Sequence, residues 1–149
     1  MSTVFHGVKM QMPDGWNNAS TLVYVAPPSE TYSLPTTAKQ DPMAQGSLVV
    51  TPMDVSGDFD VQGQLQAIAS HLSQEIPSFS EKDRFEENTP GKQVAGLISE
   101  QSEPFPVMQM YAIVKIGSRG LQVVASAPKT IFQEVKPAFD AFLGSLGEA

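Results

Sequence analysis

Residues 107–127 of the chain read VMQMYAIVKIGSRGLQVVASA, and this stretch decides the fold. Two apolar runs rich in β-branched side chains flank the tetrapeptide Gly117-Ser118-Arg119-Gly120. A short polar connection with glycine at both ends is typical of the tight turn of a β-hairpin. The pattern therefore predicts two neighbouring antiparallel strands, one over residues 107–116 and one over residues 121–127.

The segment before this hairpin extends the same sheet. Residues 93–101 form another largely apolar run, and the turn sequence Thr89-Pro90-Gly91-Lys92 precedes it. Before that turn, residues 81–87 read EKDRFEE, an alternating and charged segment. Charges of this kind keep an exposed edge strand from pairing with other chains. The segment therefore predicts an exposed strand at the edge of the sheet.

Three further strands are predicted near the N-terminus. Residues 4–12 alternate between apolar and polar side chains, which is typical of a half-buried strand. Residues 21–26 are nearly continuously apolar and β-branched. Residues 47–51 form a third run, and Pro52 indicates that this strand frays or lies near an edge. Between the second and third runs, residues 28–46 carry several prolines and small polar groups, which predict a long surface loop.

Two segments change to helical spacing. The first helical segment runs from about Val61 to Ile76. Asp58 or Asp60 is its candidate N-cap, and Pro77 ends it. The second is expected over residues 136–146, with Pro137 in its first turn, because proline has no N–H to donate inside a helix. The apolar positions of the first recur every three or four residues: Val61, Leu65, Ile68, Leu72 and Ile76. Those of the second are Val135, Phe139, Phe142, Leu143 and Leu146.

The predicted order is thus three strands, a helix, four strands and a final helix. Such an order belongs to the α+β class, in which helices cover an antiparallel sheet. We expect one domain over residues 1–149, built as a mostly antiparallel six- to seven-stranded sheet flanked by helices. A chain of 149 residues fits a single core of this kind.

The composition excludes several classes of function. With 9 basic and 16 acidic residues the net charge is −7, and the basic residues form no cluster, so a nucleic-acid binder is not expected. The chain has no cysteine, which excludes disulfides and thiolate chemistry. The first residues show no secretory signal, and no apolar run is long enough to span a bilayer. A cytoplasmic protein without membrane anchoring is the simple expectation.

Catalytic patterns are scarce. The two histidines, His6 and His71, occur in no zinc-binding spacing, and no nucleophile elbow or phosphate-binding loop is present. The acidic residues within 81–87 alternate with Lys82 and Arg84, which favours a solvated strand over a calcium site. We therefore expect no enzyme, no catalytic residue, no metal and no cofactor.

Two predicted strands are apolar on both faces, whereas a strand with one face in solvent should alternate apolar and polar residues. In residues 21–26, Thr21, Val23 and Val25 share one face, yet both faces are apolar. Residues 107–116 show the same surplus, including Met108 and Met110. Exposed apolar surface marks an interaction site, and flexible methionines suit varied apolar partners. The same methionines also suit a packed core, and the sequence leaves both interpretations open.

Several motifs occur in the order found in the DcrB-like/Eag family. The segment Met12-Pro13-Asp14-Gly15-Trp16-Asn17, followed by residues 21–27, resembles the opening of that family. The helix end Ile76-Pro77-Ser78-Phe79, residues 110–115 and the segment Lys136-Pro137-Ala138-Phe139 resemble later parts. The resemblance extends from about residue 5 to residue 146.

This resemblance implies a Mog/PsbP-like α/β/α sandwich and a protein-binding function. Eag members are dimeric chaperone-adaptors of bacterial type VI secretion, which shelter N-terminal transmembrane helices of PAAR/Rhs-type effectors before export. The resemblance implies groove-facing positions at Thr21 and Val23 and, on the later strand, near Met110. Together with the apolar surplus of the two strands, the residues expected to bind the partner are Thr21, Val23, Val25, Met108 and Met110. The alternatives are a scaffolding or regulatory module whose partner is soluble on its own, and a binder of small ligands.

Overall fold

The computed structural model describes most of the chain. The described segments are residues 2–5, 7–11, 13–15, 21–25, 46–55, 59–102 and 106–147. The predicted loop over residues 28–46 lies outside them, apart from Gly46.

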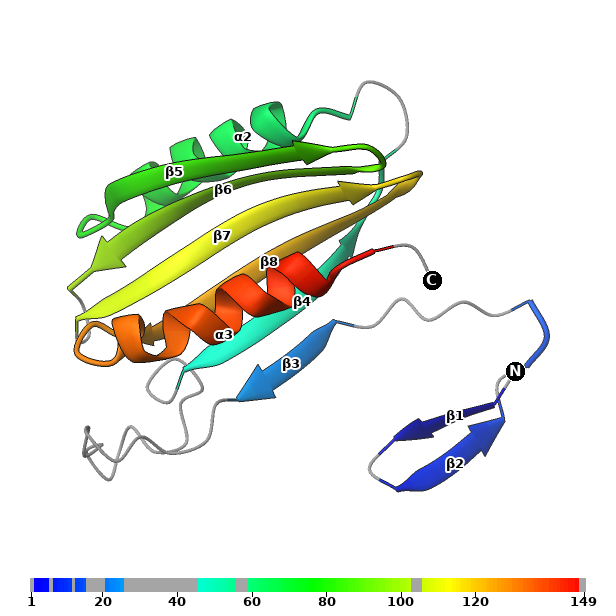
Figure 1. The fold of residues 1–149 in the computed structure, drawn as a ribbon. Coiled ribbons are helices and arrows are strands. Elements are labelled where there is room, and N and C mark those ends of the chain that lie inside the picture. The colour runs from blue at the N-terminus through cyan, green and yellow to red at the C-terminus, as the bar shows by residue number, and fades with distance from the viewer. Residues whose placement is uncertain are drawn as a thin grey trace.

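A six-stranded, fully antiparallel sheet forms the centre of the molecule (Figure 1). The predicted hairpin is confirmed: β7 and β8 pair in register from Val107 opposite Pro128 to Ile116 opposite Arg119. The α+β class is confirmed as well. Across the sheet the strands are β3 (Leu22–Val25), β4 (Ser47–Met53), β8 (Arg119–Pro128), β7 (Val107–Ile116), β6 (Lys92–Gln101) and β5 (Ser80–Thr89).

The structure corrects the prediction of a single strand over residues 4–12. Residues 4–12 do not form one strand: β1 (Ser2–Phe5) and β2 (Val8–Gln11) pair with each other in a separate two-stranded sheet. The chain reverses at Gly7, whose φ of 77° lies in the left-handed region that glycine adopts without strain. In Figure 1 this hairpin lies apart from the six-stranded sheet, near its β3 end.

Helix α2 (Val61–Glu75) follows the predicted spacing closely. Its N-cap is Asp60, whose carboxylate accepts hydrogen bonds from the backbone N–H groups of Gln62 and Gly63. A cap of this kind satisfies N–H groups that have no partner inside the helix and stabilises it by about 1 kcal/mol. Val61 and Leu65 of its apolar stripe are buried against the sheet, and so is Ala69, which the predicted stripe did not include.

Helix α3 (Phe132–Ser145) begins one turn earlier than predicted, and Pro137 lies inside it. The extra turn is stabilised by packing, because Phe132 is fully buried and its ring lies 6.2 Å from the ring of Phe139. Pro137 cannot donate to the carbonyl of Gln133, but Gln133 is exposed, so water can satisfy that oxygen.

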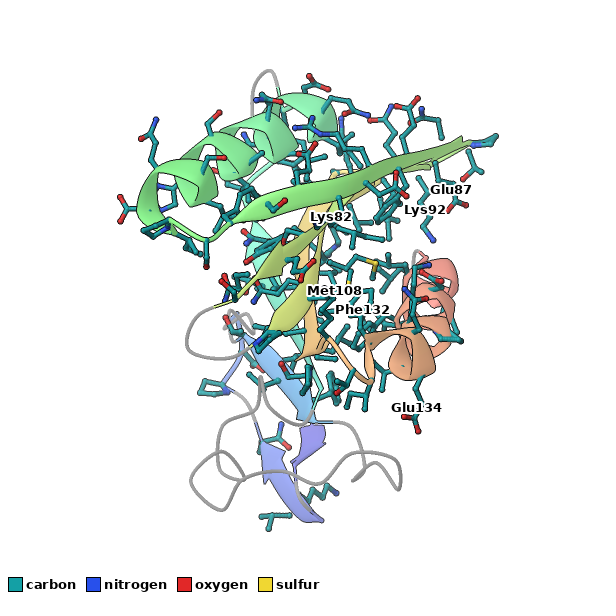
Figure 2. The ribbon with its side chains drawn as sticks, turned by 90° about the vertical axis from the view of Figure 1, so that its left-hand side faces the viewer. Lys82, Glu87, Lys92, Met108, Phe132 and Glu134 are labelled. Carbon is teal, nitrogen blue, oxygen red and sulfur yellow. The ribbon has the colours of Figure 1, made fainter. Side chains whose placement is uncertain are left out.

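The two helices cover opposite faces of the sheet (Figure 2). Helix α2 packs on the face formed by Ala95, Leu97, Tyr111 and Ile113 of β6 and β7. Helix α3 packs on the other face, where the larger cluster lies. That cluster includes Leu48, Val50, Val94, Ile98, Met110, Ala112, Val114, Val123, Ala125, Ala127, Phe132, Phe139 and Leu143. The result is a three-layer sandwich whose sheet extends beyond both helices at β3.

Candidate functional site

The cross-strand register assigns each predicted binding residue to a face. Val23 lies opposite Val49, Val49 opposite Val124, and Val124 opposite Tyr111, which belongs to the α2-side core. Thr21 precedes Val23 by two positions in the same extended chain, so it lies on the α2 side as well. Val25 has the same parity, but its side chain lies outside those described.

The two methionines lie on the other face. Met110 is opposite Ala125, and Ala125 is opposite Leu48, all within the α3-side core. Met110 is only 1% exposed, so it is a core residue, and Met108 is half-buried against the same cluster. Figure 2 shows Met108 on the same side of the sheet as Phe132. The structure therefore does not bring Met108 and Met110 together with Thr21 and Val23.

Exposure rises steadily along the row that contains Val23. Leu97 on β6 is fully buried under α2, and Tyr111 on β7 is 7% exposed. The next two residues, Val124 and Val49, are half-buried, and Val23 on β3 is 55% exposed. The equivalent row on the α3 face stays buried as far as Leu48 on β4. Helix α2 thus covers one end of its face and leaves the other end open.

We call Val23, Val49 and Val124 the valine strip. It runs across β3, β4 and β8: Val124 packs against the cluster under α2, whereas Val23 at the other end is 55% exposed. One side of the strip is polar: Thr51 and Gln122 are half-buried, and the Thr21 hydroxyl lies 3.5 Å from the Thr51 hydroxyl. The strip is a narrow apolar surface, the kind of surface that binds apolar partners.

The other side of the strip is a buried polar row. Ser99, Gln109, Ser126 and Ser47 lie opposite one another on β6, β7, β8 and β4, and all four are buried. The Tyr111 hydroxyl donates to Gln109 Oε1 at 2.6 Å, and Gln109 Nε2 donates to Ser126 Oγ at 3.1 Å. These bonds hold the Gln109 amide in one orientation beside the strip.

Burial also sets the ionisation of Tyr111. Loss of hydration raises the pKa of its phenol to about 12. A tyrosine is neutral at physiological pH even without this shift, which extends to higher pH the range in which the phenol can donate to Gln109.

Val49 and Val124 were not singled out from the sequence. Each belongs to an adjacent pair of valines, Val49-Val50 and Val123-Val124, in which one residue faces each side of the sheet. Such pairs are expected wherever both faces of a sheet are apolar. The neighbouring sequence therefore does not indicate which valine of a pair is exposed. Only the position of α2 decides that.

The described residues were compared with the requirements of a metal site and of a membrane-spanning helix. Among them, no three His, Asp or Glu side chains converge as metal ligands would. No helix in the described segments has the length and apolar character needed to cross a bilayer.

Comparisons with known proteins identify the fold. No family model matches the chain, and no curated protein matches its sequence. Among solved structures, a protein of unknown function from Pseudomonas aeruginosa, PA94, described as a putative regulator, is similar with a TM-score of 0.70. The two share 15% sequence identity, and the similarity covers 100% of this chain and 96% of that one.

A second similar structure is LpqN of Mycobacterium tuberculosis, described as involved in cell envelope biogenesis. Its TM-score is 0.50 at 17% identity, with 85% of this chain and 82% of LpqN covered. At such identities the likeness concerns the backbone alone. The chain therefore has the α+β fold of PA94 and LpqN, and its described residues form a six-stranded antiparallel sheet and two helices.

Proposed function

We propose that the chain is a cytoplasmic chaperone-adaptor of bacterial type VI secretion, without catalytic activity. Its client would be the apolar N-terminal transmembrane segment of a PAAR/Rhs-type effector, bound before export. The observation that carries the proposal is the valine strip, an apolar surface that leads from the α2-side core to the exposed Val23. The collinear motifs that resemble the Eag family support it.

The physical need for such a protein is large. A transmembrane helix exposes apolar side chains on every face, and each Å² left in water costs about 25 cal/mol. A strip lined by valines, with hydroxyl and amide groups on both sides, can cover part of that surface. Binding of a helix to an apolar surface is a common recognition mode.

The alternative is a non-enzymatic scaffolding or regulatory module. It is favoured by the polar residues that border the strip, Thr51 and Gln122, because interfaces between folded proteins are of mixed polarity. The description of PA94 as a putative regulator points the same way. In this case the partner would be soluble without the chain.

The test begins with a tagged chain purified from its host without detergent, with mass spectrometry to identify bound polypeptides. The apolar segment of any effector so identified is then expressed alone with the wild-type chain. We expect the segment to remain in solution and to co-purify. Val23→Asp should abolish co-purification, since it places a carboxylate on the strip at a position that is already 55% exposed.

Val8→Asp is the matched control. Val8 is 61% exposed but belongs to the β1–β2 hairpin, outside the strip. Both variants should retain the far-ultraviolet spectrum of the wild type. Equal client binding by Val23→Asp and Val8→Asp would refute the assignment to the strip, and a partner that is soluble alone would favour the scaffolding function.

A further inference from the structure

The β1–β2 hairpin carries an exposed apolar side chain and forms a sheet of its own. Neither of its strands packs extensively against another helix or strand of the described residues. Val8 on β2 is 61% exposed and lies opposite Phe5 of β1 in the register. A lone two-stranded hairpin is only marginally stable in water and gains stability when an apolar face packs on another element. The hairpin therefore needs apolar surface on which to dock.

The apolar surface within its reach is the valine strip. Among the described residues four large hydrophobic side chains are exposed, Val8 on the hairpin and Leu22, Val23 and Tyr24 on β3. Residues 12–21 connect the hairpin to β3, and a ten-residue chain spans at most about 35 Å. The three strands of the strip span roughly 14 Å at about 4.8 Å each. The connection is therefore long enough for the hairpin to reach every part of the strip.

We infer that the β1–β2 hairpin is an autoinhibitory cover, which folds onto the valine strip with Val8 against Val23 and is displaced when a client binds. This inference rests on the proposed function, because the strip is the proposed client site. The sizes agree, since each hairpin strand has four residues and is about 13 Å long, close to the width of the strip. Lys9 follows Val8 in the alternation, so in the closed arrangement it lies on the outer face of the hairpin. Figure 1 shows the hairpin away from the six-stranded sheet, which is the open arrangement.

A client can displace a cover of this size. The apolar part of a transmembrane helix is about 30 Å long, so it buries more apolar area than a short hairpin does, and the stabilisation grows with the area buried. The client meets the strip only in the open fraction of molecules. Its apparent dissociation constant therefore equals the intrinsic constant divided by that fraction. A change that weakens the cover should consequently strengthen client binding.

The first measurement detects the cover without a client. The chain has no cysteine, so Val8→Cys/Val23→Cys places two thiols where the closed hairpin brings them together. A short bifunctional maleimide should join them within one chain, giving a product that keeps the 16.0 kDa of one chain plus the linker. Lys9→Cys/Val23→Cys is the matched control, because position 9 is also exposed but lies on the opposite face of the hairpin. We expect cross-linking several-fold faster for the first variant, and equal rates would overturn the inference.

The second measurement shows whether the cover limits access to the strip. In a Val23→Cys variant the thiol reacts with iodoacetamide only while the hairpin is open. Adding Val8→Asp should speed that reaction several-fold, because a carboxylate is costly to bury against apolar side chains. Adding Lys9→Asp instead should leave the rate unchanged. A rate that Val8→Asp does not raise would overturn the inference, since the hairpin would then not protect Val23.

Client binding separates the inference from the proposed function. Val8→Asp should bind an effector segment several-fold more tightly than the wild type, whereas Val23→Asp should not bind it. Cross-linking and thiol protection without capture of any segment would leave the cover standing and remove the chaperone function. Capture of the segment with equal affinity by the wild type and Val8→Asp would keep the function and overturn the autoinhibition.

Discussion

The phenyl ring of Phe85 on β5 lies directly over the Cα of Gly96 on β6, its opposite residue in the register. A methyl group at position 96 would overlap the ring. An aromatic ring over a cross-strand glycine fills the space that a missing side chain leaves, and this pair attaches the charged edge strand to the core.

Gly96→Ala should therefore destabilise the protein by about 1–3 kcal/mol, because Phe85 must move from the core to make room. Gly144→Ala is the control, since a Cβ at position 144 of α3 meets nothing within 4 Å. The measurement is urea unfolding followed by circular dichroism. In a Phe85→Ala background the cost of Gly96→Ala should shrink, and an unchanged cost would refute the overlap as its cause.

Lys92 forms a long-range cap on α3. Its ammonium donates to the carbonyl oxygen of Leu143 at 2.6 Å, and α3 has no basic residue in its own last turn. Lys92→Met should cost about 1–2 kcal/mol of unfolding free energy, because the bond to the negative end of the helix is lost. Lys136→Met, which breaks the exposed pair with Asp140, should cost about 0.5 kcal/mol or less. Equal costs would contradict a capping role for Lys92.

Tyr111→Phe should leave Gln109 Oε1 without its donor and cost about 1–3 kcal/mol. The phenol also predicts a pH dependence. Its pKa is about 12 in the folded state and about 10 in the unfolded chain. The phenol therefore loses its proton at a lower pH in the unfolded chain than in the folded one. The stabilisation is complete below pH 10 and is lost as the pH rises from 10 to 12.

This pH dependence is measurable as the difference between wild type and Tyr111→Phe in urea unfolding from pH 8.5 upward, within the range where the chain still folds. The wild type should lose up to about 1.4 kcal/mol per pH unit more than the variant above pH 10. Parallel curves would show that Tyr111 is not held in its neutral form by burial.

Glu100 should give a pH dependence of stability opposite in direction to that of Tyr111. Its carboxylate accepts a hydrogen bond from the Lys129 ammonium at 2.7 Å, and the Lys82 ammonium lies 3.6 Å away. The bond from Lys129 is the main cause of the lowered pKa of Glu100. The contribution to stability is therefore present above the unfolded pKa and lost as the pH falls through the folded value. Lys129→Gln should raise the pKa of Glu100 in an NMR titration, and Lys136→Gln should leave it unchanged.

The sheet and α2 could be predicted because their signals are local. The Gly117–Gly120 turn, the alternation of the strands and the Asp60 cap act within a few residues. The start of α3 could not, because it depends on Phe132 entering a core formed by distant strands. The reversal at Gly7 depends on one backbone conformation that glycine permits but does not require.

The candidate surface could be predicted only in part. Alternation places Thr21 and Val23 on one face, and the register agrees. Whether Met110 shares that face depends on the register through β4 and β8, and a shift of one residue would reverse it. The exposure of Val49 and Val124 depends in turn on where α2 lies, which no residue near either valine encodes.

The unequal edges of the sheet also limit how far association can proceed. A molecule with two adhesive edges can add copies without end, which is the geometry of a growing fibril. Here the β5 edge presents Glu81, Asp83, Glu86 and Glu87 to any approaching copy. Strand β3 at the other edge carries no charge, whereas the charged side chains of β5 disfavour growth of the sheet on that side.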